Sequence, residues 1–81
     1  MGNDIFQKTC INIVAQKEGL LKKDVYIVWM VKVLQNNKAL VSTNQLNGMY
    51  YEITFNGDKE EFYLDYYTKT KNEKIDLREE Y

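Results

Sequence analysis

The sequence contains no histidine and no proline, and it has a single cysteine, Cys10. The lack of histidine removes the usual general base near neutral pH, the commonest metal ligand and the Ser-His and Cys-His pairs of hydrolases. One cysteine can form neither an internal disulfide nor a thiolate zinc cluster, which favours a reducing cytoplasm over an extracellular setting. The composition therefore predicts a non-catalytic protein with no cofactor and no metal site.

A long hydrophobic run and an excess of positive charge are also missing. The longest apolar run, Val25 to Val31, is far shorter than the roughly 20 residues that cross a bilayer. No basic region followed by an apolar stretch opens the chain, so we expect neither a membrane span nor a secretion signal. Eleven Lys and Arg against twelve Asp and Glu give a net charge of −1, which disfavours binding to double-stranded nucleic acid.

What remains is the composition of one folded domain. The 81 residues are 44% hydrophobic and 28% charged, and they include seven Tyr, three Phe and one Trp. These proportions are typical of a globular chain with a single core. We predict one domain over residues 1–81 with a flexible tail from about residue 72, where only Ile75 and Leu77 are apolar.

A helix is predicted over residues 4–18. Asp4 and Gln7 have the spacing of a capping box, and Gly19 suits a left-handed helix end. The apolar residues that fall on one helical stripe are Phe6, Cys10, Ile13 and Val14. Because this stripe faces the core, we expect a buried and inert thiol at Cys10.

Residues 24–34 are crowded with β-branched and aromatic side chains, which is typical of a central strand. One alternating face is entirely apolar and is predicted to pack against the helix. Its members are Val25, Ile27, Trp29, Val31 and Val33. We therefore expect Trp29 to be largely buried, in contact with Val31 and Phe55.

A turn at residues 35–37 and a strand at residues 38–43 are predicted next, because asparagine tolerates tight turns. The register is open at this point. A three-residue loop would place Val41 beside Val31 in the core, whereas a two-residue loop would send Val41 to the outer face.

A third strand over residues 49–55 leads to Asn56-Gly57, a strong hairpin signal. A four-residue loop is predicted here, because it pairs Ile53 with Phe62, whereas a two-residue loop would place the like charges of Glu52 and Glu61 opposite each other. A strand at residues 60–64 would then precede a short helix at 65–71. The alternative is one helix over residues 59–71. The predicted fold class is α+β: an N-terminal helix packed on a three- or four-stranded antiparallel β-meander, with a short helix after the last strand.

The sheet face away from the helix is the candidate binding surface. We predict that it carries Tyr26, Met30, Lys32, Tyr50 and Tyr63, with Glu52 among them. Aromatic and Met side chains around a few charges are typical of interfaces, so a protein partner or a second copy of the chain, giving a homodimer, is expected here. Lys32 beside stacking tyrosines would alternatively suit a nucleotide.

Two segments carry a family resemblance: DVYIVWMVKVLQNNKALVST (residues 24–43) and GMYYEITFNGDKEEFYLD (residues 48–65). Together they resemble an uncharacterised family of small proteins encoded in phages and prophages of low-GC Gram-positive bacteria. The resemblance implies the cytoplasm of a bacterial host and an accessory protein that acts by binding, with a host-defence component as a candidate target. It transfers no functional residue.

Overall fold

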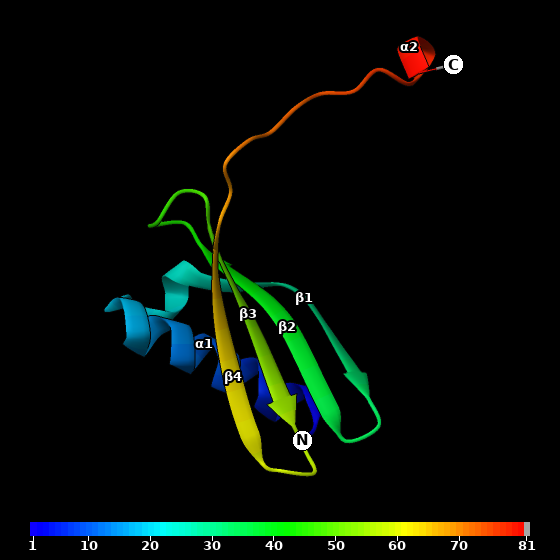
Figure 1. Ribbon diagram of the computed structural model, residues 1–81. Coiled ribbons are helices and arrows are strands. Elements are labelled where there is room, and N and C mark those ends of the chain that lie inside the picture. The colour runs from blue at the N-terminus through cyan, green and yellow to red at the C-terminus, as the bar shows by residue number, and fades with distance from the viewer. Residues whose placement is uncertain (81) are drawn as a thin grey trace.

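The computed structural model describes the backbone of residues 1–80 and the side chains of residues 1–78. One helix lies across one face of a four-stranded antiparallel sheet, in which each strand pairs with its sequence neighbour (Figure 1). The elements are α1 (Asn3–Glu18), η1 (Lys22–Asp24), β1 (Val25–Val33), β2 (Asn36–Thr43), β3 (Met49–Asn56), β4 (Glu61–Thr68) and α2 (Leu77–Glu80). The predicted α+β class, with an N-terminal helix on an antiparallel meander, is confirmed.

Helix α1 forms where the apolar stripe predicts it. The side chains of Phe6, Cys10 and Val14 are fully buried against the sheet. Gly19 ends the helix in the left-handed conformation, with φ of 67°. The predicted capping box is wrong, because Gly2 is the N-cap. Asp4 lies within the first turn, where its negative charge interacts favourably with the positive end of the helix dipole.

The buried thiol at Cys10 is also confirmed. Burial raises the pKa of Cys10 to about 12.

We expect the folded protein to resist Ellman's reagent at pH 8, because the reactive thiolate forms only when the core opens. Denaturant should release one rapidly reacting thiol per chain. Because the pKa of this thiol is higher in the folded state than in the unfolded state, the free energy of unfolding should fall as the pH rises above the pKa of an unburied thiol. Fast labelling of the native protein would contradict the packing.

A β-bulge between Ile27 and Trp29 exchanges the two faces of β1. Before the bulge, Ile27 packs against the core on the α1 side, and after it Met30 does so. Trp29 and Val31 are 43% and 46% exposed on the opposite face. One extra residue shifts the two-residue alternation by one position. The prediction of a buried Trp29 in contact with Val31 and Phe55 is therefore wrong.

The bulge also resolves the register of β1 and β2. Val33 pairs with Asn36, so the turn has two residues and begins earlier than predicted. Asn37 is consequently a buried strand residue, and its Nδ2 donates a hydrogen bond to the carbonyl oxygen of Met1 at 3.0 Å. A two-residue turn with a regular strand would expose Val41. With the bulge, Val41 pairs with Ile27 and stays in the core.

The loop between β3 and β4 has the predicted four residues, since Asn56 pairs with Glu61. The register differs by two residues from the predicted one, because Phe62 pairs with Phe55. A shift of two residues leaves every side chain on its predicted face. The ring centroids of Phe55 and Phe62 lie 4.8 Å apart, and those of Tyr51 and Tyr66 lie 5.6 Å apart.

Pairing with β3 extends β4 through Thr68. The predicted helix at residues 65–71 is therefore wrong, and so is the alternative helix at residues 59–71. Beyond Thr68 the chain leaves the sheet and has no regular structure until the four residues of α2 (Figure 1).

The core lies between α1 and the sheet. It consists of one cluster of buried side chains: Phe6, Cys10, Val14, Ala15, Val25, Ala39, Val41, Tyr51, Ile53 and Phe55. All of the buried strand residues in this cluster face α1, so the opposite face of the sheet contributes nothing to it.

Candidate functional site

The sheet face that α1 does not cover is called the outer face here. Side chains that are paired across the strands form four rows on it. Read from β1 to β4, three complete rows are Tyr26, Ser42, Tyr50, Tyr67; Trp29, Leu40, Glu52, Asp65; and Val31, Lys38, Thr54, Tyr63, and a fourth row consists of the pair Val33 and Asn36 and the pair Asn56 and Glu61. All four strands therefore contribute to one surface.

The outer face exposes large hydrophobic side chains. Those that are 43–60% exposed are Tyr26, Trp29, Val31, Val33, Tyr63 and Tyr67. Four of them come from β1, and the bulge places Trp29, Val31 and Val33 on this side. A contiguous apolar patch with a polar border is characteristic of interaction sites.

Negative charge borders the patch on β3 and β4. Glu52 and Asp65 are directly opposite each other, an arrangement in which like charges repel. Lys38 Nζ lies 3.6 Å from Glu52 Oε1 and offsets part of this charge. The Tyr63 hydroxyl donates a hydrogen bond to Glu61, and this bond raises the pKa of Tyr63. The outer face is thus apolar over β1 and acidic towards β4.

A shallow hollow of about 340 Å³ lies on the outer face near the two hairpin turns. Val31, Val33, Thr54 and Tyr63 line it, and Lys38 lies at its wall. Asn36, Asn37 and Asn56 also line it, although most of the surface exposed inside it is apolar. The hollow could therefore take an apolar side chain, with the Lys38 ammonium group next to it.

The structure divides the five predicted site residues between the two faces. Tyr26, Tyr50 and Tyr63 lie on the outer face, as expected. Met30 and Lys32 lie on the α1 side, because they pair with the buried residues Ala39 and Asn37. The expectation that all five residues share one face is wrong, and the bulge in β1 is the reason.

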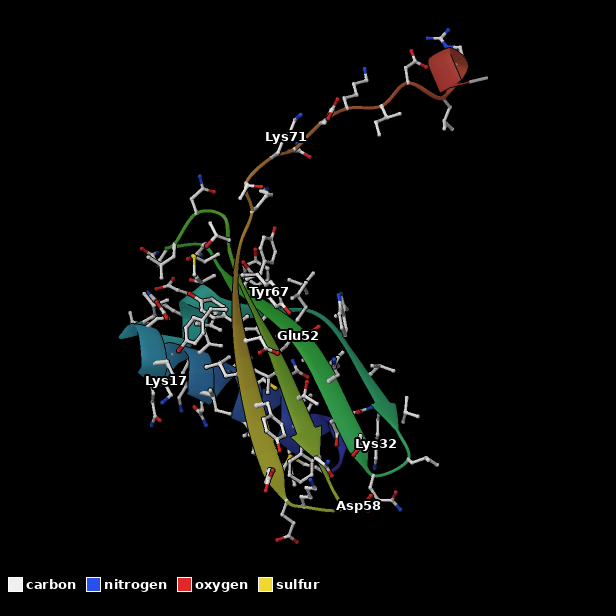
Figure 2. The ribbon with its side chains drawn as sticks, viewed as in Figure 1. Lys17, Lys32, Glu52, Asp58, Tyr67 and Lys71 are labelled. Carbon is white, nitrogen blue, oxygen red and sulfur yellow. The ribbon has the colours of Figure 1, made fainter. Side chains whose placement is uncertain are left out.

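The separation of Lys32 from the tyrosines bears on nucleotide binding. In Figure 2, Lys32 lies towards the turn between β1 and β2, whereas Tyr67 and Glu52 lie further along the sheet. The cation on the outer face is Lys38, and it contacts Glu52. The stacking arrangement proposed around Lys32 is therefore not assembled.

Trp29 and Tyr67 are surface residues that the sequence-based reasoning missed. A regular strand would place Trp29 in the core, and the helix predicted at residues 65–71 would take Tyr67 off the sheet. The sequence did contain one signal of the bulge. Ile27 and Val41 are both apolar, but a regular strand pairing with a two-residue turn cannot keep both of them in the core.

Two buried polar atoms lie away from the outer face. Asn37 Oδ1 has no hydrogen-bond partner within the part of the chain that is described, and the Tyr51 hydroxyl lies near the carboxylate of Glu18. Burial, and then the negative charge of Glu18, raise the pKa of Tyr51. Within residues 1–78, no cluster of three His, Cys, Asp or Glu side chains could bind a metal ion. No helix in this range is long and apolar enough to span a membrane.

The fold and the outer face define a class of small α+β protein, in which one helix covers one side of a four-stranded meander and the other side is aromatic with an acidic border. Residues 3–77 match the family described as a family of unknown function (DUF6275), and the chain belongs to this family. The match includes α1 and all four strands. No curated protein and no solved structure matches the chain.

Proposed function

We propose that this protein is a non-catalytic accessory protein that acts by binding a partner protein across its outer face. The supporting observation is the group of exposed hydrophobic side chains on the outer face, which α1 leaves uncovered. Tyr and Trp are enriched among the residues that contribute most to binding energy. Trp29 lies next to Leu40 in the middle rows of this face and is its strongest candidate anchor.

The charges of the outer face indicate the chemistry of the partner. Glu52, Asp65 and Glu61 lie along β3 and β4, with Lys38 as the one cation in the four rows. A partner that presents Lys or Arg beside an apolar side chain would complement both halves of the face. The apolar side chain would fill the hollow next to Tyr63.

The biological setting is part of the proposal. The resemblance of residues 24–65 to small phage and prophage proteins supports a role in the cytoplasm of a low-GC Gram-positive host. A host-defence component is the target that we propose. Such a role needs a stable binding surface and no catalytic group, which agrees with a histidine-free sequence.

Truncating Trp29 to alanine tests the binding surface. We expect Trp29→Ala to weaken partner binding by about 30-fold or more, because central hot-spot residues contribute about 2 kcal/mol or more. The tagged wild-type protein and the variant would each be used to capture partners from host lysate, with quantification by mass spectrometry. The affinity of each enriched protein would then be measured by calorimetry after purification.

Leu34→Ala is the matched control, because Leu34 is 82% exposed in the turn between β1 and β2 and lies outside the four rows. It should capture the same protein as wild type. Equal capture by Trp29→Ala and wild type would show that the outer face is not the binding surface.

A further inference from the structure

Strand β4 is an uncovered edge of the sheet. Its neighbour on one side is β3, and no other strand of the four lies on its opposite side. The chain beyond Thr68 leads away from the sheet and does not cover this edge (Figure 1). The backbone N–H and C=O groups on an open edge can pair with another strand.

The two edges of the sheet differ in how they resist such pairing. Edge strand β1 has a bulge and carries Lys32, two features by which proteins block edge-to-edge association. From Glu61 to Thr68, β4 contains no lysine or proline, and its pairing with β3 is regular throughout. The edge that is open to pairing is therefore β4.

We infer that β4 pairs antiparallel with β4 of a second copy of this chain, to form a symmetric dimer with one continuous eight-stranded sheet. The two-fold axis would run perpendicular to the sheet, so that both outer faces lie on the same side. Two residues that are opposite each other in the dimer must then lie on the same face of the sheet. Residues on one face of a strand are an even number of positions apart. The two-fold axis therefore passes at a residue of β4 and not between two residues, and each possible register is named by that central residue.

The sequence of β4 is self-complementary in the register centred on Leu64. The opposed pairs are Leu64 with Leu64, Phe62 with Tyr66, Tyr63 with Asp65 and Glu61 with Tyr67. All of the pairs on the α1 side are hydrophobic, and each carboxylate on the outer side faces a tyrosine. Tyrosine hydroxyls can donate hydrogen bonds to these carboxylates, as Tyr63 already does to Glu61.

Neighbouring registers bring like charges together. A register centred on Asp65 opposes that carboxylate to itself, and one centred on Tyr63 opposes Glu61 to Asp65 twice. Like charges directly across a strand pair are destabilising. A register centred on Tyr66 would pair only five residues of β4, whereas the one centred on Leu64 pairs seven. The avoidance of like-charge pairs and the number of paired residues therefore both favour the register centred on Leu64.

Packing on the α1 side supports the same contact. Phe62 and Tyr66 are 38% and 52% exposed, although the Phe62 ring stacks on Phe6 of α1. In the dimer, each Phe62 would be covered by Tyr66 of the other copy. The pairing would therefore bury the apolar surface that α1 leaves open beside β4.

Cysteine cross-linking in the full chain tests the register. Opposed residues of an antiparallel pair have Cα atoms about 4.5–5.5 Å apart, a separation that a disulfide spans. Leu64→Cys should give a covalent dimer under mild oxidation, and the buried Cys10 should not compete. Asp65→Cys and Tyr63→Cys should cross-link at least about ten-fold more slowly, because their thiols would be offset along the strands. Faster cross-linking at either control position would overturn the inferred register.

Sedimentation measures the association without any cysteine substitution. The apparent mass of the wild-type protein should rise from 9.7 kDa towards twice that value as its concentration increases across the micromolar range. Tyr66→Lys should weaken association by about ten-fold or more, since a lysine on an edge strand blocks pairing. Val33→Lys, on the β1 edge, should leave it unchanged, and circular dichroism would confirm that both variants fold. A wild type that remains monomeric, or equal effects of the two lysines, would overturn the inference.

The edge contact is separate from the partner-binding surface. Trp29 lies on β1, the strand farthest from β4. Trp29→Ala should therefore leave the sedimentation unchanged even where it abolishes partner binding. A dimer that forms without any captured partner would support the edge pairing while leaving the outer-face proposal to its own experiment.

Discussion

Replacing Phe6 with alanine is expected to lower the free energy of unfolding by about 3–5 kcal/mol. Phe6 is fully buried, and its ring stacks on Phe62 with centroids 6.4 Å apart. Truncation removes the transfer free energy of the ring and leaves a cavity between α1 and the sheet. Because small domains are stable by only about 5–15 kcal/mol, this one change would remove a large part of the total.

Chemical denaturation followed by circular dichroism measures this loss. Trp29→Ala is the matched control, because it also removes an aromatic ring, but from a side chain that is 43% exposed on the outer face. Its expected effect is about 1 kcal/mol, since no closed cavity forms. If Trp29→Ala proved as destabilising as Phe6→Ala, the position of the bulge in β1 would be wrong.

Replacing Gly57 with alanine is expected to destabilise the protein by about 1–3 kcal/mol, as is typical of overpacking. A Cβ atom at Gly57 would overlap the carbonyl oxygen and the side chain of Gln35. The Gly57 N–H also donates a hydrogen bond to Asn36 Oδ1 at 3.2 Å. The two hairpin turns therefore lie against each other, and an added methyl group would force them apart.

Thermal unfolding of Gly57→Ala and Gly2→Ala would be compared. A Cβ atom at Gly2 meets nothing within 4 Å, and the backbone there has φ of −71°, which alanine adopts readily. We expect Gly2→Ala to cost less than about 1 kcal/mol, through the weaker N-cap alone. Equal melting temperatures for the two variants would mean that the turns are not in contact.

Features that depend on neighbouring residues were predictable from the sequence. The stripe of Phe6, Cys10 and Val14 identified α1 and its buried face, because helical periodicity is a local property. Asn56-Gly57 identified the hairpin between β3 and β4, and the like charges of Glu52 and Glu61 favoured its four-residue loop. The reason for the glycine was different, since Gly57 is required by its contact with Gln35 from the other hairpin.

The candidate surface was only partly predictable. Tyr26, Tyr50 and Tyr63 were placed on the outer face because the alternation holds in β3, in β4 and in β1 before the bulge. Met30 and Lys32 were misplaced because they follow the bulge. Tyr67 was missed because the sequence predicts a helix over residues 65–71, whereas pairing with β3 holds the segment as a strand.

The sequence by itself determined the α+β class, the antiparallel meander and the buried face of α1, because composition and periodicity act over a few residues. Only the tertiary structure decided which side of β1 faces the core and how far β4 extends. Both depend on pairing between strands. A single inserted residue in β1 lets Val41 remain buried beside Ile27, and it turns Trp29 outward. The surface that we propose for binding therefore arises from how the strands align, a property that no single segment encodes.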